Sequence, residues 1–115
     1  MVFTFQKQFH SKVQRGLKTN TIRATRRGKV GDAVSLRKWT GAPYRSKQAV
    51  LREAILKEIL SVQITPFDVF LDGKRFSGQH LAVMDGFKDW EGMRDWFDNV
   101  HGLPFNGWFY RWELQ

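Results

Sequence analysis

The sequence predicts a mixed α+β fold, a small β-barrel that carries two short helices. Many short segments are rich in β-branched and aromatic residues and alternate apolar with polar positions, as strands do. Turn signals separate these segments, and only two stretches carry apolar residues at helical spacing. The 10 phenylalanines and 5 tryptophans give a chain of 115 residues enough apolar mass for a core of its own.

The N-terminal region predicts a strand followed by a helix. Residues 2–5 are apolar and β-prone, which is typical of a short strand. From Phe5 the next apolar positions are Phe9 and Val13, a recurrence every four residues that indicates a helix. Gly16 stands where a helix C-cap prefers glycine, so we expect the helix to end just before it.

The following region predicts two strands and a loop. Residues 17–23 alternate and are rich in β-branched side chains, which favours a strand or an extended edge. Gly28 and Gly31 mark turns, and residues 33–39 alternate again as a strand. Residues 40–47 contain glycine, proline and basic residues, which predicts a loop.

The next segments predict the second part of the sheet. Residues 50–64 are apolar with scattered charges, which favours one long or bent strand, or two strands. A helix over residues 48–60 remains an alternative because that stretch also contains good helix formers. Residues 67–76 predict a hairpin, since Asp72-Gly73 is a strong turn signal between two β-prone runs.

The C-terminal region predicts a second helix and a closing strand. The helix is expected from residue 88 to residue 100, because its large apolar residues share one helical face, and Gly102 and Pro104 then end it. Residues 108–114 alternate as an aromatic strand. Alternation places Trp108, Tyr110 and Trp112 on one face, with Phe109 and Arg111 on the other.

Charge and cysteine content narrow the classes of function. The net charge is +8, and it is uneven: residues 1–57 hold 14 Lys and Arg against 2 Asp and Glu, whereas residues 58–115 hold 5 against 9. Such a basic half predicts a face that attracts polyanions. The chain has no cysteine, which excludes disulfides and thiolate metal sites. No segment has the length and apolarity of a membrane span or a secretory leader, so we expect a cytoplasmic protein without membrane contact.

Several motifs then resemble those of one known family. The run from Gly16 to Arg23, Gly-Leu-Lys-Thr-Asn-Thr-Ile-Arg, resembles the G-x-K-T-x-T-x-R signature of ASCH domains. Four further segments resemble later parts of that family in the same order: Val30-Gly31-Asp32, then Thr40-Gly41 with Arg45-Ser46-Lys47, then Asp85-Gly86-Phe87 with Met93, Phe97 and Gly102, and finally Gly107 to Trp112. The resemblance spans about residues 3 to 113.

The resemblance implies a fold and a class of function. It implies one ASCH domain over residues 1–115, a PUA-like β-barrel whose cleft is lined by the first motif and the Asp85 segment. ASCH domains are linked to RNA, and one small bacterial branch consists of amidohydrolases that deacetylate N4-acetylcytidine with a Lys, a Thr and a Glu. Those positions correspond here to Lys18, Thr21 and Asp85, so an aspartate, one methylene shorter, stands in place of the glutamate.

The candidate catalytic residues Lys18 and Thr21 would have to lie close together, with Lys18 uncharged. Thr21 would supply the nucleophilic hydroxyl, and Lys18 would have to be neutral to take its proton. An offset of three residues places two side chains on opposite faces of a strand, so a bend would be needed to bring them together. Arg23 has two alternatives, a structural ion pair with Asp85 or a phosphate contact.

The basic segments predict a nucleic-acid surface. Its candidate residues are Arg23, Arg26, Arg27, Tyr44, Arg45 and Lys47. The cations would follow a phosphate backbone, and Tyr44 would stack on a base. Trp39 has two interpretations, a core residue or a second stacking surface. The expected partner is RNA, a nucleotide or a modified nucleoside.

The alternatives fall into three classes. The leading prediction is a binding domain for RNA or nucleotides, and the second is the amidohydrolase. A ribonuclease, an activity also ascribed to some ASCH proteins, and a protein-interaction module with a basic docking face are further alternatives. The three histidines, His10, His80 and His101, have no metal-ligand spacing, so neither a metal nor another cofactor is expected. The sequence leaves the oligomeric state open.

Overall fold

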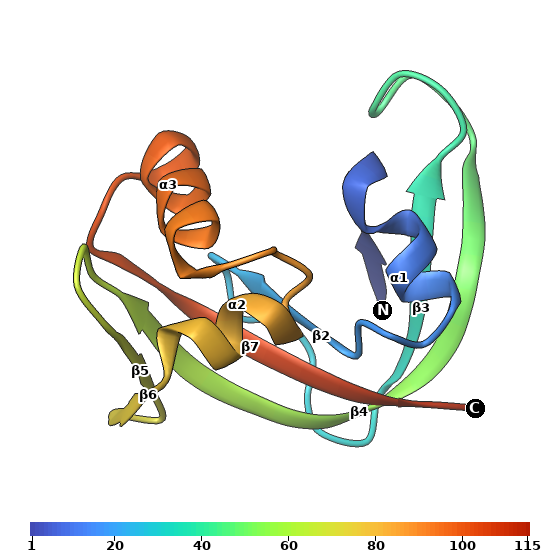
Figure 1. Ribbon diagram of the computed structural model, residues 1–115. Helices are drawn as coiled ribbons and strands as arrows, with labels where there is room; N and C mark the ends of the chain where they lie inside the picture. Colours follow the sequence, from blue (N-terminus) through green and yellow to red (C-terminus); the bar gives the residue numbers. More distant parts are fainter.

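The computed structural model describes residues 1–115 and forms a strongly bent sheet with helices at its two ends (Figure 1). The elements, in order, are β1 (Val2–Thr4), η1 (a 3-10 helix, Lys7–Phe9), α1 (His10–Gln14), β2 (Asn20–Arg23), β3 (Ala33–Trp39), β4 (Gln48–Ile64), β5 (Val69–Leu71), β6 (Lys74–Phe76), α2 (Gly78–Met84), α3 (Trp90–His101) and β7 (Phe105–Leu114). The predicted α+β class is confirmed. The helix considered over residues 48–60 is wrong, since β4 occupies that stretch.

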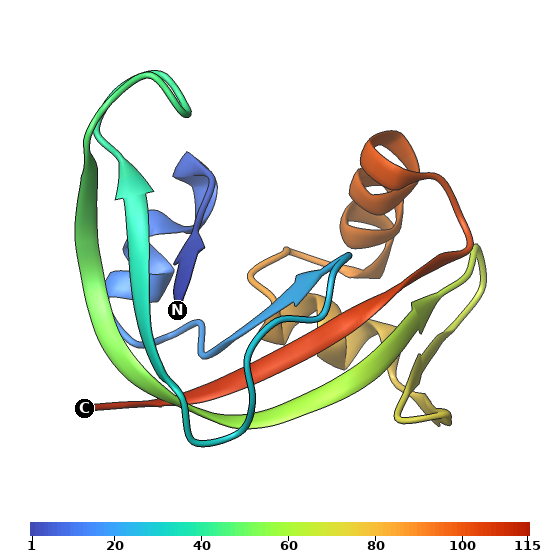
Figure 2. The same cartoon turned by 180° about the vertical axis from the view of Figure 1, so that it is seen from behind.

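The sheet has seven strands and is organised around β4, the longest strand. β4 pairs with three strands, all antiparallel. Its residues 48–55 pair with β3, residues 54–64 pair with β7, and residues 62–64 also pair with β5. β1 adds to β3 in parallel, β6 pairs with β5, and β2 pairs with β7, beside which it runs in Figure 2. These pairings do not form a ring, so the sheet is open and the predicted closed barrel is not confirmed.

Side chains, instead of a strand, contact the free edge of β1. Two arginine side chains, rather than a neighbouring strand, bind the carbonyl groups of this edge. Arg23 donates from Nη2 to the carbonyl of Thr4 at 2.7 Å, and Arg27 donates from Nη2 to the carbonyl of Val2 at 3.1 Å. These side-chain hydrogen bonds satisfy the two backbone carbonyls that a neighbouring strand would otherwise bind. Arg23 thereby connects β2 to β1 through its side chain.

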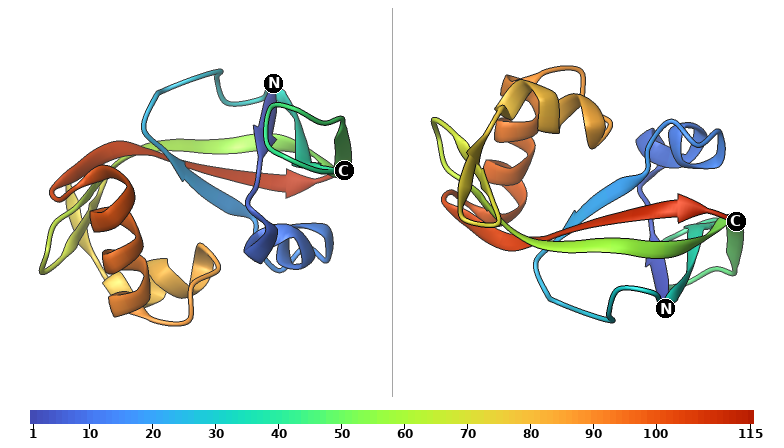
Figure 3. Two further views of the ribbon diagram at one scale, coloured as in Figure 1. Left: turned by 90° about the horizontal axis from the view of Figure 1, so that it is seen from above. Right: turned by 90° about the horizontal axis from the view of Figure 1, so that it is seen from below.

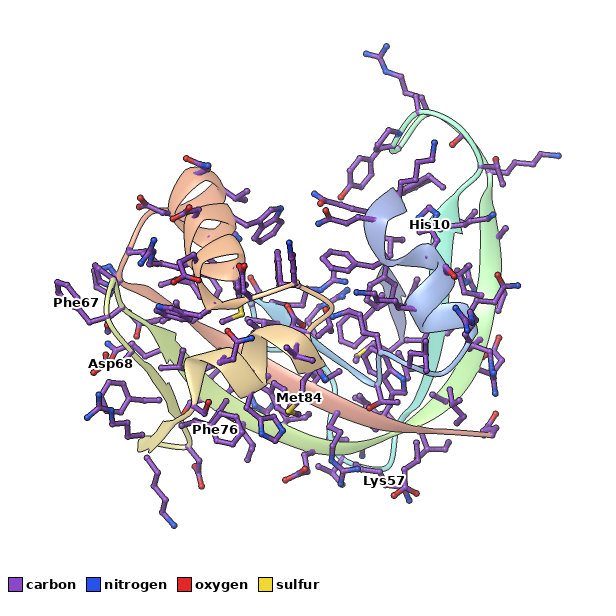
Figure 4. All side chains as sticks on the ribbon, viewed as in Figure 1. His10, Lys57, Phe67, Asp68, Phe76 and Met84 are labelled. Carbon is purple, nitrogen blue, oxygen red and sulfur yellow. The ribbon has the colours of Figure 1, made fainter.

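A bulge in β4 lets one strand serve two hydrophobic cores. The register between β4 and β7 shifts between Leu56 and Glu58, so Lys57, labelled in Figure 4, is the extra residue. Leu56 packs in the first core with Phe3, Phe5, Phe9 and Val13, and Val62 and Ile64 pack in the second with α2 and α3. The first core lies at the end of the sheet that carries η1 and α1, and the second at the other end (Figure 3).

β7 contributes to both cores through its alternation. Tyr110 and Trp112 are buried in the first core, with Trp108 packed against it, whereas Phe105 and Phe109 are buried in the second. The predicted division of this strand into two faces is therefore confirmed. Each face is apolar because each is covered, which is why the aromatic run is nearly continuous in the sequence.

The helices differ from the expected pair by one addition. The first and last predicted helices correspond to η1 with α1 and to α3, but the chain also forms α2, so the predicted two short helices become three. α2 begins after Ser77, whose hydroxyl accepts a hydrogen bond from the His80 amide at 3.1 Å. Its 7 residues are too few for an apolar repeat to emerge. No helix combines the length and apolarity that a membrane crossing requires.

Candidate functional site

A cleft of about 250 Å³ lies between the two groups of helices, with β2 at its base. Lys18, Thr21, Arg23 and Asp85 all line this cleft. Its walls come from opposite ends of the molecule: Phe5 and Phe9 belong to the first core, and Phe87, Trp96 and Phe97 pack in or against the second. The remaining lining residues are Thr4, Gln6, Ile22, Ala24 and His101. The site is therefore polar at its base and aromatic along its walls.

Lys18 and Asp85 form a buried ion pair in the cleft. The Lys18 ammonium donates to Oδ1 of Asp85 at 2.6 Å and to the backbone carbonyl of the same residue, also at 2.6 Å. Only 2% of Lys18 and 5% of Asp85 is exposed. The pair has low access to water, so its charges interact more strongly than they would at the surface.

Tight turns present the two partners. Gly16 has φ +75° and ends α1, after which the amides of Leu17 and Lys18 both bond to the carbonyl of Lys12. Asp85 is the C-cap residue of α2, and Gly86 follows it with φ +99°, a left-handed conformation that favours glycine. These two glycines turn the chain so that Lys18 and Asp85 face each other across the cleft.

Side chains from the neighbouring elements hold the Asp85 turn in place. Lys12 donates from Nζ to the carbonyl of Gly86 at 2.9 Å, and Asn20 donates from Nδ2 to the carbonyl of Met84 at 3.0 Å. The Asp85 segment is therefore held by Lys18 and Asn20 of the first motif and by Lys12 of α1.

Burial shifts both charged groups of the pair toward neutrality. Desolvation lowers the pKa of Lys18 from its ordinary value, and the nearby Arg23 and Lys12 lower it further, against the attraction of Asp85. Desolvation also raises the pKa of Asp85, against the attraction of Lys18 and Arg23. The aromatic rings of Phe9 and Phe5 lie 4.9 Å and 6.0 Å from the Lys18 ammonium and contribute to this apolar surrounding.

Thr21 and Arg23 lie two residues apart on β2 and share its cleft face. Arg23 donates from Nε to the Thr21 hydroxyl at 3.1 Å, which leaves the proton of that hydroxyl free to donate. The guanidinium lies over the rings of Phe3 and Phe5, 5.1 Å and 5.2 Å from their centroids. Burial lowers the pKa of Arg23 to about 10.

The geometry answers two questions that the sequence left open. β2 begins only at Asn20, so Lys18 lies before the strand, and the expected conflict of strand faces between Lys18 and Thr21 does not arise. Both line the cleft, although no hydrogen bond joins them. The proposed ion pair of Arg23 with Asp85 is not formed, because Lys18 takes that carboxylate.

A larger groove of about 740 Å³ adjoins the cleft. The two cavities share Thr4, Phe5, Gln6 and Arg23. The rest of the groove is lined by Lys7, His10, Lys38, Trp39, Thr40, Gly41, Pro43 and Tyr44. Trp39 is half-buried and contributes to the groove rather than to either core. Tyr44 is 85% exposed and its ring lies 5.0 Å from that of Trp39.

The other predicted nucleic-acid residues lie outside the cleft and the groove. Arg26 lies over the ring of Trp108 at 5.6 Å, and Arg27 binds the edge of β1. Arg45 and Lys47 are exposed on the loop after β3 and line neither cavity. Only Arg23 and Tyr44 of the predicted binding set are brought to the cavities.

Several lining residues were given no site role by the sequence analysis. Phe87, named there only within a motif, and His101, named only as a histidine without metal-ligand spacing, line the cleft, and Lys7 lines the groove. Trp96 and Phe97 share the apolar face of α3, a signal that indicates burial but does not separate a core from a cavity wall. No group of three or more His, Asp or Glu side chains is placed to hold a metal ion.

Comparisons with protein-family models, curated proteins and solved structures give no match to this chain.

Proposed function

We propose that this protein binds RNA or nucleotides and that its cleft holds one nucleobase. The observation that carries the proposal is the buried Lys18–Asp85 pair at the base of an aromatic cleft that opens beside a basic groove. Aromatic walls stack on bases, and a small number of fixed polar groups read their edges. The resemblance to ASCH domains of the PUA-like class leads to the same proposal, and its motif residues Lys18, Thr21 and Asp85 line this one cleft.

The polar groups match the edge of an aminated base. The Asp85 carboxylate offers Oδ2, which the Lys18 ammonium does not use, as an acceptor for an exocyclic amino group. The Thr21 hydroxyl offers a donor for a ring nitrogen or carbonyl. Cytosine and adenine present both functions on one edge, so we propose that the cleft prefers them to uracil.

Titration with short RNA at several salt concentrations tests the binding proposal. Affinity is expected to fall steeply as salt rises, because cations of the groove displace counterions from phosphate. The double variant Lys18→Met/Asp85→Asn is expected to reduce the preference for cytosine over uracil while keeping the net charge of the pair at zero. Binding that is insensitive to salt, or no binding of RNA or nucleotide, contradicts the proposal.

A second candidate function is an amidohydrolase that acts on N4-acylated cytidine. One observation favours it: Lys18, Thr21 and Asp85 line the same cleft, and burial lowers the pKa of Lys18 toward the neutral amine that a base requires. Oγ1 of Thr21 would attack the acetyl carbonyl, and its proton would pass to Lys18 and then to the departing N4 of cytosine. Water would hydrolyse the acetyl ester on Thr21 and release acetate, restoring the hydroxyl proton.

Incubation with N4-acetylcytidine, followed by chromatography, tests this candidate. Wild-type protein is expected to release cytidine, Lys18→Ala and Thr21→Val to release none, and Thr21→Ser to keep part of the rate because it retains the hydroxyl. The candidate is contradicted when high concentrations of wild-type protein give no turnover. It is also contradicted when Thr21→Val turns over as fast as wild type.

A further inference from the structure

We propose that the groove is a second subsite, which holds the nucleotide next to the one in the cleft, with the linking phosphate at Arg23. The preferred ligand would then be a single strand of at least two nucleotides rather than a free nucleoside. This inference rests on the proposed nucleobase site in the cleft.

The two cavities form a continuous path. Four residues, Thr4, Phe5, Gln6 and Arg23, line both of them, so a ligand leaving the cleft enters the groove directly. The shared residues come from the end of β1, the segment after it and the end of β2.

Arg23 is suited to the phosphate at the junction. Nε and Nη2 of its guanidinium are committed to Thr21 and Thr4, whereas Nη1 has no partner in the protein. No carboxylate forms a salt bridge with this arginine, and it is partly buried between aromatic rings. Asp85 attracts this guanidinium without pairing with it directly. A partly desolvated guanidinium that no carboxylate contacts favours an anion, and its planar donors suit phosphate oxygens. Lys7 and Lys38 add positive charge along the groove.

Trp39 and Tyr44 provide a stacking surface for the second base. Tyr44 is held with φ +61°, a left-handed conformation that is uncommon for a bulky residue. Such strain is typical of functional positions, where the surroundings hold a side chain in place. Here the strained residue is 85% exposed, and its ring lies beside that of Trp39.

The loop that carries Tyr44 is braced by its own hydrogen bonds. Thr40 binds the carbonyl of Lys47 through its amide and its hydroxyl, both at 2.8 Å. Ser46 accepts from the Gly41 amide at 3.0 Å and donates to the carbonyl of Ala42 at 2.8 Å. The ring of Tyr44 is therefore positioned before a ligand arrives, which reduces the entropy lost on binding.

The burial of Lys18 and Asp85 favours a single strand over a duplex. A base reaches Lys18 and Asp85 only when it is unstacked from its neighbours and unpaired. Base stacking on exposed aromatic side chains tolerates any base, so the groove is expected to add affinity with little sequence preference.

Binding measurements with a series of short ligands test the second subsite. The series is cytidine, cytidine monophosphate, and the dinucleotides that join cytidine to adenosine in either order. At least one dinucleotide is expected to bind about 10- to 100-fold more tightly than the monophosphate, which corresponds to one stacked base. Tyr44→Ala is expected to lower the ratio of dinucleotide to monophosphate affinity by about tenfold.

Phe67→Ala is the matched control, because it removes an aromatic ring that is 86% exposed on the loop after β4, remote from both cavities (Figure 4). It should leave the affinity ratio unchanged. The second subsite is overturned when neither dinucleotide binds more tightly than the monophosphate, or when Tyr44→Ala leaves their ratio unchanged.

A different result would overturn the nucleobase site itself. Dinucleotide binding that depends on Tyr44, without detectable cytidine binding and without any effect of Lys18→Met/Asp85→Asn, would contradict the proposed function and the joined site. The groove would then hold nucleic acid without the cleft.

Discussion

Lys18 and Asp85 lie 67 positions apart in the sequence, and their side chains meet at 2.6 Å in a place that water barely reaches. The Lys18 ammonium also donates to the backbone carbonyl of Asp85. Each charge therefore has the other as its one direct ionic partner, with Arg23 attracting Asp85 from farther away.

Removing one member of this pair should cost more than removing both. Lys18→Met and Asp85→Asn each leave one buried charge without its partner, which typically destabilises a protein by about 3–5 kcal/mol. The double variant replaces both charges by neutral groups of similar size and is expected to lose less than either single variant. Urea unfolding of the four proteins at pH 7 measures these free energies. Additive losses would contradict this account of the pair.

The same pair predicts an unusual dependence of stability on pH. Burial raises the pKa of Asp85 in the folded state. The contribution of Asp85 to the free energy of unfolding therefore falls as pH rises from the ordinary carboxyl value of about 4. Burial lowers the pKa of Lys18. The contribution of Lys18 to the free energy of unfolding therefore rises as pH approaches the ordinary lysine value of 10.5. The free energy of unfolding of wild type, minus that of the double variant, should therefore be lowest between these limits. A maximum at neutral pH would contradict the two pKa directions.

Gly107 should tolerate no side chain, because β2 runs too close to it. A Cβ at Gly107 would lie 2.6 Å from the carbonyl oxygen of Arg23 and 2.6 Å from the ring of Phe105. Gly107→Ala is expected to destabilise the protein by about 1–3 kcal/mol and to weaken nucleotide binding, since β2 carries Thr21 and Arg23. Gly73→Ala is the control: its Cβ meets nothing, and its φ of +75° costs about 1–2 kcal/mol without moving β2. Equal effects of the two variants on binding would contradict this prediction.

The strained backbone at Tyr44 should give its glycine and alanine variants different stabilities, although both variants lose the stacking ring. In Tyr44→Ala the left-handed backbone remains strained, whereas glycine adopts the same φ of +61° freely. Tyr44→Gly is therefore expected to be more stable to urea than Tyr44→Ala by about 1 kcal/mol, while both lose dinucleotide affinity. Identical unfolding free energies for the two variants would show that the loop carries no strain.

The position of each lysine or arginine should determine its part in RNA binding. Lys7→Gln and Lys38→Gln remove cations that line the groove, and each is expected to lower the slope of log affinity against log salt by about one. Arg45→Gln and Lys47→Gln lie outside both cavities and should change the slope much less. The reverse order would place the RNA on the loop after β3 instead of in the groove.

Most of the strands could be predicted because their signals are local. Val34 and Leu36 alternate with Ser35 and Arg37, and the strand predicted over residues 33–39 is β3 with the same bounds. Asp72 and Gly73 both have positive φ, as the predicted hairpin turn requires. The open sheet could not be predicted in this way, because strand order is set by pairings between distant segments, and the contacts of Arg23 and Arg27 with the edge of β1 are likewise distant in the sequence.

The candidate site was predictable in its residues but not in its contacts. Resemblance to a motif indicated Lys18, Thr21 and Asp85, and all three line the cleft. Their pairing depends on where β2 begins and on the turns at Gly16 and Gly86, which hydrophobic periodicity does not report. Similarly, an apolar face on α3 does not reveal that Trp96 borders a cavity, since core and wall positions share the same pattern.

The arrangement of two cores along one bent strand has a consequence for how the molecule moves. Phe87 packs against both cores, and the cleft lies at their boundary, with Phe9 on one side and Phe97 on the other. A molecule held between these rings would add to the contacts that already join the two halves, which are β4 and β7 along the base and the side chains of Lys12, Lys18 and Asn20 at the Asp85 turn. Occupancy would thus turn two semi-independent lobes into one cooperative unit, so that local opening at either end becomes as rare as opening of the whole.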